Sequence, residues 1–123
     1  MNNFLSTKFT TKVKGNFMEQ EAIKYLEGRG FIVLAQNYRS KRCEIDIIAK
    51  RLDLTIFIEV KYRKNNLFGY PEDFLSDGQI ERIYNAAEQF MLENNFINKI
   101  RFDVVAVMLK NSKIDIQHFE DAF

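Results

Sequence analysis

Cysteine and histidine, the residues that build disulfides and most structural zinc sites, are almost missing from this sequence. There is one cysteine, Cys43, and one histidine, His118. A single cysteine cannot form an internal disulfide, and one cysteine with one histidine cannot make a zinc site of the usual kind. We therefore interpret Cys43 as a small packing residue and His118 as a hydrogen-bonded structural residue.

Chain breakers are also scarce, with 1 Pro and 5 Gly in 123 residues. Together with 46% apolar residues, this excludes a disordered, collagen-like or mostly loop protein. No apolar run approaches the ~18–20 residues needed to cross a bilayer, and the N-terminus lacks the residue order of a secretion signal. We expect a cytoplasmic protein without membrane contact, with a basic arm over residues 1–14 and a single domain over 15–123.

The spacing of apolar residues predicts two helices and five strands. The helices are expected over about 16–28 and 77–94, the second beginning with a capping box formed by Ser76 and Gln79. The strands are expected over residues 31–38, 44–50, 54–62, 101–109 and 113–119. The order helix, three strands, helix, two strands predicts an α/β fold, with a mixed central sheet covered by helices on both faces.

Two of these strands carry carboxylates where a core would exclude them. If residues 44–50 and 54–62 form a hairpin with a two-residue turn, Asp46 lies opposite Glu59, and Glu44 faces Lys61. Directly opposed like charges repel, so a bound divalent cation or a shared proton must compensate. We favour the cation, because Lys61 is a positive neighbour for a metal-activated water. The alternative is an ordinary Glu44–Lys61 ion pair, with Asp46 and Glu59 reaching solvent.

A third carboxylate belongs to the first expected helix. On a helical wheel, Glu19 falls inside the apolar sector that contains Met18, Ala22 and Leu26, whereas Glu27 falls outside it. A charge on a buried helix face needs a partner, because burying it unpaired is costly. Glu19 is therefore a candidate for the same cluster as Asp46.

An acid on a first helix, then Asp, then Glu-x-Lys on neighbouring strands resembles the PD-(D/E)XK nucleases. With its flanking residues, the sequence resembles the bacterial YraN family of endonuclease-like proteins, itself similar to archaeal Holliday-junction resolvases. The resemblance covers about residues 15–123, but Met18 and Cys43 stand where the family usually has Gly, and Gln79 replaces a basic residue. The matching residues are Glu19, Ala22, Tyr25, Leu26 and Gly30, then 37–39, 44–49, 57–63, 68–71, 86–87 and 101–105, and finally His118, Ala122 and Phe123.

The resemblance implies a restriction-endonuclease-like fold and a metal-dependent nuclease that hydrolyses phosphodiesters in duplex or branched DNA. It implies that Asp46 and Glu59 hold Mg²⁺ or Mn²⁺, helped by the Val60 carbonyl and by Glu19 directly or through water, and that Lys61 orients the attacking water. The residues expected to neutralise DNA phosphates are Arg39, Lys41, Arg42, Arg63 and Lys64. Cutting both strands of a junction would require a homodimer, for which the sequence identifies no interface.

Charge placement is compatible with a DNA-binding face but does not require one. Residues 37–64 hold eight bases against four acids, although a solvated face gives the same count.

Two alternatives to the nuclease stay open. One is a non-catalytic nucleic-acid-binding module that is a partner of the DNA-processing or recombination machinery. The other is an assembly subunit without DNA binding, whose surface Phe residues form a self-complementary patch.

Overall fold

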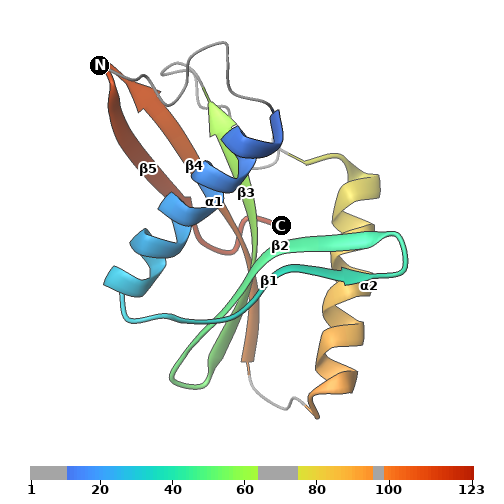
Figure 1. Ribbon diagram of the computed structural model, residues 1–123. Coiled ribbons are helices and arrows are strands. Elements are labelled where there is room, and N and C mark those ends of the chain that lie inside the picture. Colours follow the sequence, from blue (N-terminus) through green and yellow to red (C-terminus); the bar gives the residue numbers. More distant parts are fainter. Residues whose placement is uncertain (1–10, 64–74, 96–98) are drawn as a thin grey trace.

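The computed structural model describes residues 11–63, 75–95 and 99–123 (Figure 1). The predicted α/β class and the order α-β-β-β-α-β-β are confirmed. No helix in these ranges is long and apolar enough to cross a membrane. The elements are α1 (Thr11–Gly28), β1 (Ile32–Ser40), β2 (Cys43–Arg51), β3 (Leu54–Arg63), α2 (Asp77–Glu93), β4 (Lys99–Lys110) and β5 (Lys113–Phe119).

The first helix begins earlier than predicted. Apolar periodicity indicates a start near residue 16, but α1 begins at Thr11. The pattern misses this start because residues 11–15 contain a single apolar residue, Val13, which is too few to show a period. Part of the predicted basic arm is therefore helical. The rest of the arm, residues 1–10, and the predicted phosphate contact Lys64 lie outside the described residues.

The five strands form one sheet in the order β1-β2-β3-β4-β5. All neighbouring pairs are antiparallel except β3 and β4, which are parallel and are connected through α2. The predicted hairpin register is confirmed where β2 pairs with β3, since Ile48 lies opposite Phe57 and Arg51 opposite Leu54. The two-residue turn is closed by Leu52, whose φ of 55° is left-handed.

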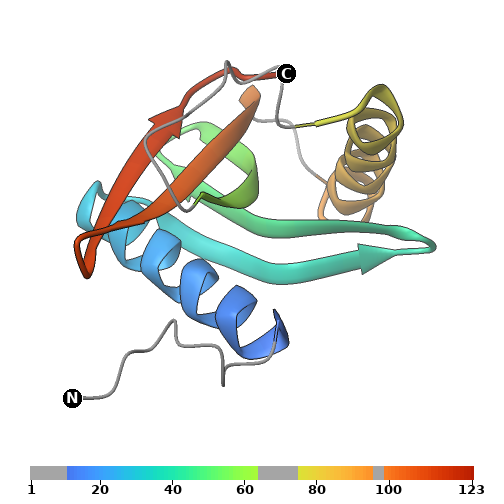
Figure 2. The same ribbon diagram turned by 90° about the horizontal axis from the view of Figure 1, so that it is seen from above.

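The helices cover opposite faces of the sheet, which Figure 2 shows from above. On one face, Met18, Ala22 and Leu26 of α1 pack on a buried cluster that includes Ile58 and Val105. This arrangement confirms the apolar sector predicted for the first helix. On the other face, buried side chains of α2 pack over the opposite sides of β2, β3 and β4, and Cys43 contacts that cluster as a packing residue.

The second helix holds the far end of the β1–β2 hairpin. Its predicted capping box is confirmed, because Ser76 Oγ accepts from the Gln79 backbone N–H and the Gln79 side chain accepts from the Ser76 N–H. Near the other end of α2, Tyr38 Oη donates to Glu93 Oε1 over 2.6 Å, and its ring packs edge-on against Phe90. Burial and the bond to Glu93 raise the pKa of Tyr38 to about 12. These contacts fix the hairpin against α2.

Candidate functional site

The candidate site lies where β2 leaves β3. Their paired register ends at Ile47 and Ile58, whereas β3 continues beside β4 as far as Arg63. In Figure 1 the β1–β2 hairpin turns away toward α2 at this point while β3 runs on. The opening is a cleft of about 220 Å³ between the hairpin, β3 and α2. A break in strand pairing thus creates room for polar side chains inside a sheet protein.

Two carboxyl groups meet at the inner end of this cleft. Asp46 Oδ2 accepts a hydrogen bond of 2.8 Å from the backbone N–H of Val60, which holds the Asp46 carboxylate against β3. The Glu59 carboxyl is hydrogen-bonded to Asp46. Burial, that hydrogen bond and the negative charge of Asp46 raise the pKa of Glu59 to about 9, although Lys61 opposes the shift. The raised pKa favours the protonated form of Glu59 near neutral pH.

Glu19 approaches the pair from the opposite face of the sheet. Burial and then the negative charge of Asp46 raise its pKa, whereas a hydrogen bond from the Asn37 side chain lowers it. Asn37 lies between Gln36 and Tyr38, which pair with Ile47 and Ile45, so Asn37 is opposite Asp46 on β1. The structure thus brings Glu19 into the electrostatic range of Asp46, as the helical wheel predicts.

Sequence reasoning did not assign a site role to Asn37, although a signal was available. Its φ of 50° is in the left-handed region, which Asn tolerates better than most residues. This backbone conformation in the middle of β1 accompanies the side-chain bond to Glu19. The sequence feature that could have indicated it is an Asn, a residue that tolerates the left-handed region, within an expected strand.

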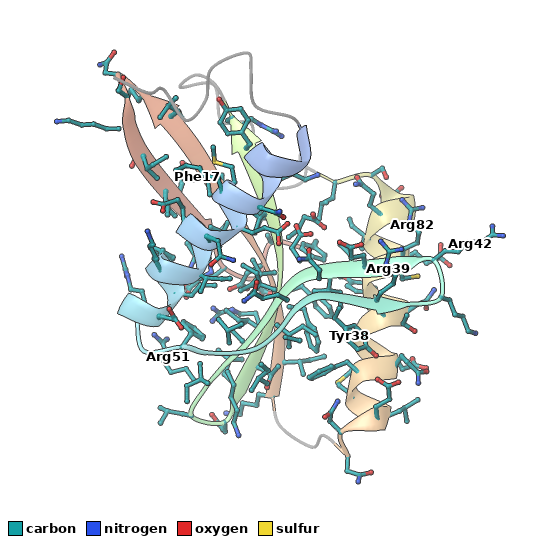
Figure 3. All side chains as sticks on the ribbon, in the orientation of Figure 1. Phe17, Tyr38, Arg39, Arg42, Arg51 and Arg82 are labelled. Atoms are coloured by element: carbon teal, nitrogen blue, oxygen red, sulfur yellow. The ribbon has the colours of Figure 1, made fainter. Side chains whose placement is uncertain are left out.

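Two arginines line the cleft beside the carboxyl pair, and only one of them was predicted. Arg42 comes from the β1–β2 turn and Arg82 from α2, and both are labelled in Figure 3. Arg82 follows Gln79 by about one helical turn, and both residues line the cleft. The base that the resemblance leads one to expect at Gln79 is therefore present three residues later, at Arg82. A search for bases at helical spacing from Gln79 would have found Arg82.

The other predicted phosphate contacts are placed less favourably. Glu44 was predicted to face Lys61, and the alternative made the two an ordinary ion pair. Instead Glu44 pairs with Arg39 over 2.8 Å, because β2 has left β3 by this point and still adjoins β1. Lys41 is exposed at the hairpin turn. Arg63 donates to the Tyr62 carbonyl over 3.0 Å. Of the predicted basic residues in the described ranges, Arg42 is the one that lines the cleft.

Lys61 is close enough to act on Glu59 but is not part of the cleft wall. Its positive charge lowers the pKa of Glu59, against the larger effects that raise it. Lys61 is half-buried on β3, two residues beyond Glu59 and on the same side of the strand. Its ammonium is therefore a neighbour of the carboxyl pair, as predicted.

The donor set suits a hard divalent cation. Asp46, Glu59 and the Val60 carbonyl offer oxygen ligands, and the repulsion by which Asp46 raises the pKa of Glu59 favours a positive charge between them. In the parts of the chain that the structure describes, no three Asp, Glu, His or Cys side chains converge as a ligand group. Glu19 would accordingly contribute through water rather than as a third direct ligand.

The fold and the cleft define an α/β protein with an acidic pair in an arginine-lined opening of its sheet. Residues 18–107 match the uncharacterised protein family UPF0102, and the chain belongs to this YraN-like family. It is 47% identical over 111 residues to a UPF0102 protein of Sulfurihydrogenibium sp. (strain YO3AOP1), covering 89% of this chain and 93% of that one. It is 44% identical over 113 residues to a UPF0102 protein of Clostridioides difficile (strain 630), covering 91% and 97%. The family description names no activity.

Proposed function

We propose that the protein is a metal-dependent nuclease that hydrolyses phosphodiesters in duplex or branched DNA. The observation that carries the proposal is the half-buried Asp46–Glu59 pair, which lines a cleft together with Arg42 and Arg82. Acidic ligands beside guanidinium groups are what phosphodiester hydrolysis needs, because the acids hold a cation and the guanidiniums hold phosphate oxygens.

Each side chain in and around the cleft has its own role in this hydrolysis. Asp46, Glu59 and the Val60 carbonyl would hold Mg²⁺ or Mn²⁺, with Glu19 contributing through water. The bound cation supplies Lewis-acid stabilisation of charge on the phosphate. Lys61 orients the attacking water and favours its deprotonated form through its positive charge. Arg42 and Arg82 bind phosphate oxygens of the strand, and their guanidinium geometry permits two hydrogen bonds from each.

The proposal is tested by a cleavage assay on linear, flapped and four-way DNA with Mg²⁺ or Mn²⁺. We expect wild type to cleave at least one substrate and Glu59→Gln to be slower by at least a factor of about 10², since several kcal/mol of charge stabilisation depend on the cation. The matched control is Glu27→Gln, which alters an exposed carboxylate of α1 and should cleave like wild type. Retained DNA binding without cleavage under either metal would favour the non-catalytic binding module.

The arginines are tested through the salt dependence of DNA binding. Arg42→Gln and Arg82→Gln should each make the negative slope of log K against log salt shallower by up to ~0.9, because each removes one phosphate contact. Arg39→Gln should have a smaller effect, since Arg39 already pairs with Glu44. Lys110→Gln, an exposed cation at the end of β4, controls for net charge. Equal slopes for wild type and both cleft variants would refute this DNA face.

The assembly alternative gains no support from surface apolar residues. It depends on exposed Phe side chains, but among the described residues no Phe is one of the large apolar side chains that are exposed. Those exposed side chains are Ile32, Leu34, Leu52, Tyr84, Leu92 and Ile100.

A further inference from the structure

A second cleft lies at the other end of β2, away from the carboxyl pair. It has a volume of about 240 Å³ and opens between the end of α1, the end of β2 and β5. Figure 3 labels Arg51 at this end of the hairpin and Arg42 at the opposite end. The residues that line the second cleft are Tyr25, Arg29, Phe31, Arg51, His118 and Glu120.

Both arginines of this cleft are held in place by aromatic rings. The Arg51 guanidinium carbon lies 4.3 Å from the centre of the Phe31 ring, and its Nη1 donates to the Arg29 carbonyl over 2.9 Å. The Arg29 guanidinium lies 5.0 Å from the centre of the Tyr25 ring. Such stacking leaves the donor edge of a guanidinium available and reduces the entropy lost on binding.

Neither guanidinium has an acidic partner in the part of the chain that the structure describes. Across the described residues, no carboxylate oxygen lies within 4 Å of a nitrogen of Arg29 or Arg51. The one carboxylate in the cleft wall, Glu120, accepts from Arg101 over 3.1 Å. Two positive charges therefore face the cleft, and its one negative charge already has a partner.

The histidine of the cleft is fixed by a buried carboxylate. Asp103 is fully buried and accepts two hydrogen bonds of 2.8 Å from Arg101 and one of 3.0 Å from the Asp121 backbone. Burial alone would raise the pKa of Asp103, but the hydrogen bonds from His118, Arg101 and Asp121 lower it, so this carboxylate is ionised. His118 Nε2, at 2.7 Å, donates to Asp103, and Nδ1 lies 3.3 Å from the Tyr25 hydroxyl.

We propose that this second cleft is a binding site for a phosphate group. Arg29 and Arg51 would supply paired guanidinium donors to the phosphate oxygens, and the Tyr25 hydroxyl and His118 would form the polar wall behind them. A phosphate presents more charge and more acceptor oxygens than a carboxylate. It therefore matches two guanidiniums that have no acidic partner among the described residues. Neither Asp46 nor Glu59 lines this cleft, so phosphate binding here does not depend on the carboxyl pair.

The chain contains its own reporter for this site, because His118 is its only histidine. Titration with inorganic phosphate, followed by the ring-proton NMR signals of His118, should give a saturable shift. Arg51→Gln and Arg29→Gln should each weaken the apparent affinity by about ten-fold, the loss of one charge-assisted contact. The second variant keeps the test decisive if the first does not fold.

Lys113→Gln at the start of β5 removes one positive charge elsewhere and should leave the affinity unchanged, as should Glu59→Gln in the first cleft. A shift that does not saturate, or affinities unchanged in both arginine variants, would overturn the proposal.

Competition by oligonucleotides then identifies the source of the phosphate. Displacement only by a 5′-phosphorylated strand indicates a terminal phosphate, displacement by phosphorylated and unphosphorylated strands alike indicates backbone phosphates, and no displacement indicates a free phosphate.

Discussion

Lys61→Met is expected to lower the cleavage rate by a factor of roughly 10²–10⁴ while leaving metal binding and DNA binding largely intact. The reason is that Lys61 does not line the cleft that holds Arg42 and Arg82, but places its ammonium close enough to lower the pKa of Glu59. A positioned group that assists proton transfer contributes on this scale. Rates should be measured at saturating DNA and metal, so that the change is in the chemical step.

The substitution keeps the aliphatic stem, so packing of β3 is preserved. Lys110→Met removes an exposed cation at the far end of β4 and should cleave at the wild-type rate. If Lys61 were only a surface charge, its loss would cost at most about 1 kcal/mol of stability and leave cleavage unchanged. Equal rates for wild type and Lys61→Met would therefore refute the role of Lys61 even with the cation site intact.

In the absence of metal, the melting temperature should fall by up to about 10 °C between pH 6 and pH 8. The pKa of Glu59 is raised from 4.5 to about 9 on folding. A raised carboxyl pKa stabilises the fold fully below about pH 4.5, and this contribution is lost progressively as the pH rises toward 9. The maximum slope is ~1.4 kcal/mol per pH unit, and each kcal/mol corresponds to a few degrees in a domain of this size.

Glu59→Gln isolates this effect, because its amide donates to Asp46 at every pH and imitates the protonated acid. Its melting temperature should exceed that of metal-free wild type at pH 8, and the difference should shrink toward pH 5. Saturating Mg²⁺ or Mn²⁺ should raise the melting temperature of wild type at pH 8 but not that of Glu59→Gln, because the cation replaces the proton on Glu59 and the amide cannot ionise to bind it. Parallel pH profiles for both proteins would show that Glu59 does not hold the proton.

Much of the fold follows from local patterns in the sequence. The Ser76–Gln79 capping box and the register that places Ile48 opposite Phe57 depend on neighbouring residues and strict alternation, and both are confirmed. The start of α1 was missed, because residues 11–15 contain only one apolar residue and so show no apolar period. Periodicity reports only the part of a helix that faces a core.

The candidate site was predictable only in part. The hairpin register predicted the meeting of Asp46 with Glu59, although β2 and β3 stop pairing one residue earlier, at Ile47 and Ile58. The approach of Glu19 followed from the helical wheel. The pairing of Glu44 with Arg39 and the entry of Arg82 depend on where β2 separates from β3. That separation is set by tertiary contacts of the hairpin with α2, which alternation along one strand does not encode.

The parallel pairing of β3 with β4 has a consequence for a chain made from its N-terminus. β3 ends at Arg63, but the strand that pairs with its other edge begins at Lys99, after α2 has been made. Until then Ile56, Phe57 and Ile58, which are at most 1% exposed in the complete fold, belong to an open sheet edge. Open apolar edges are templates for aggregation. The strand that carries Glu59 and Lys61 is protected only once β4 has left the ribosome.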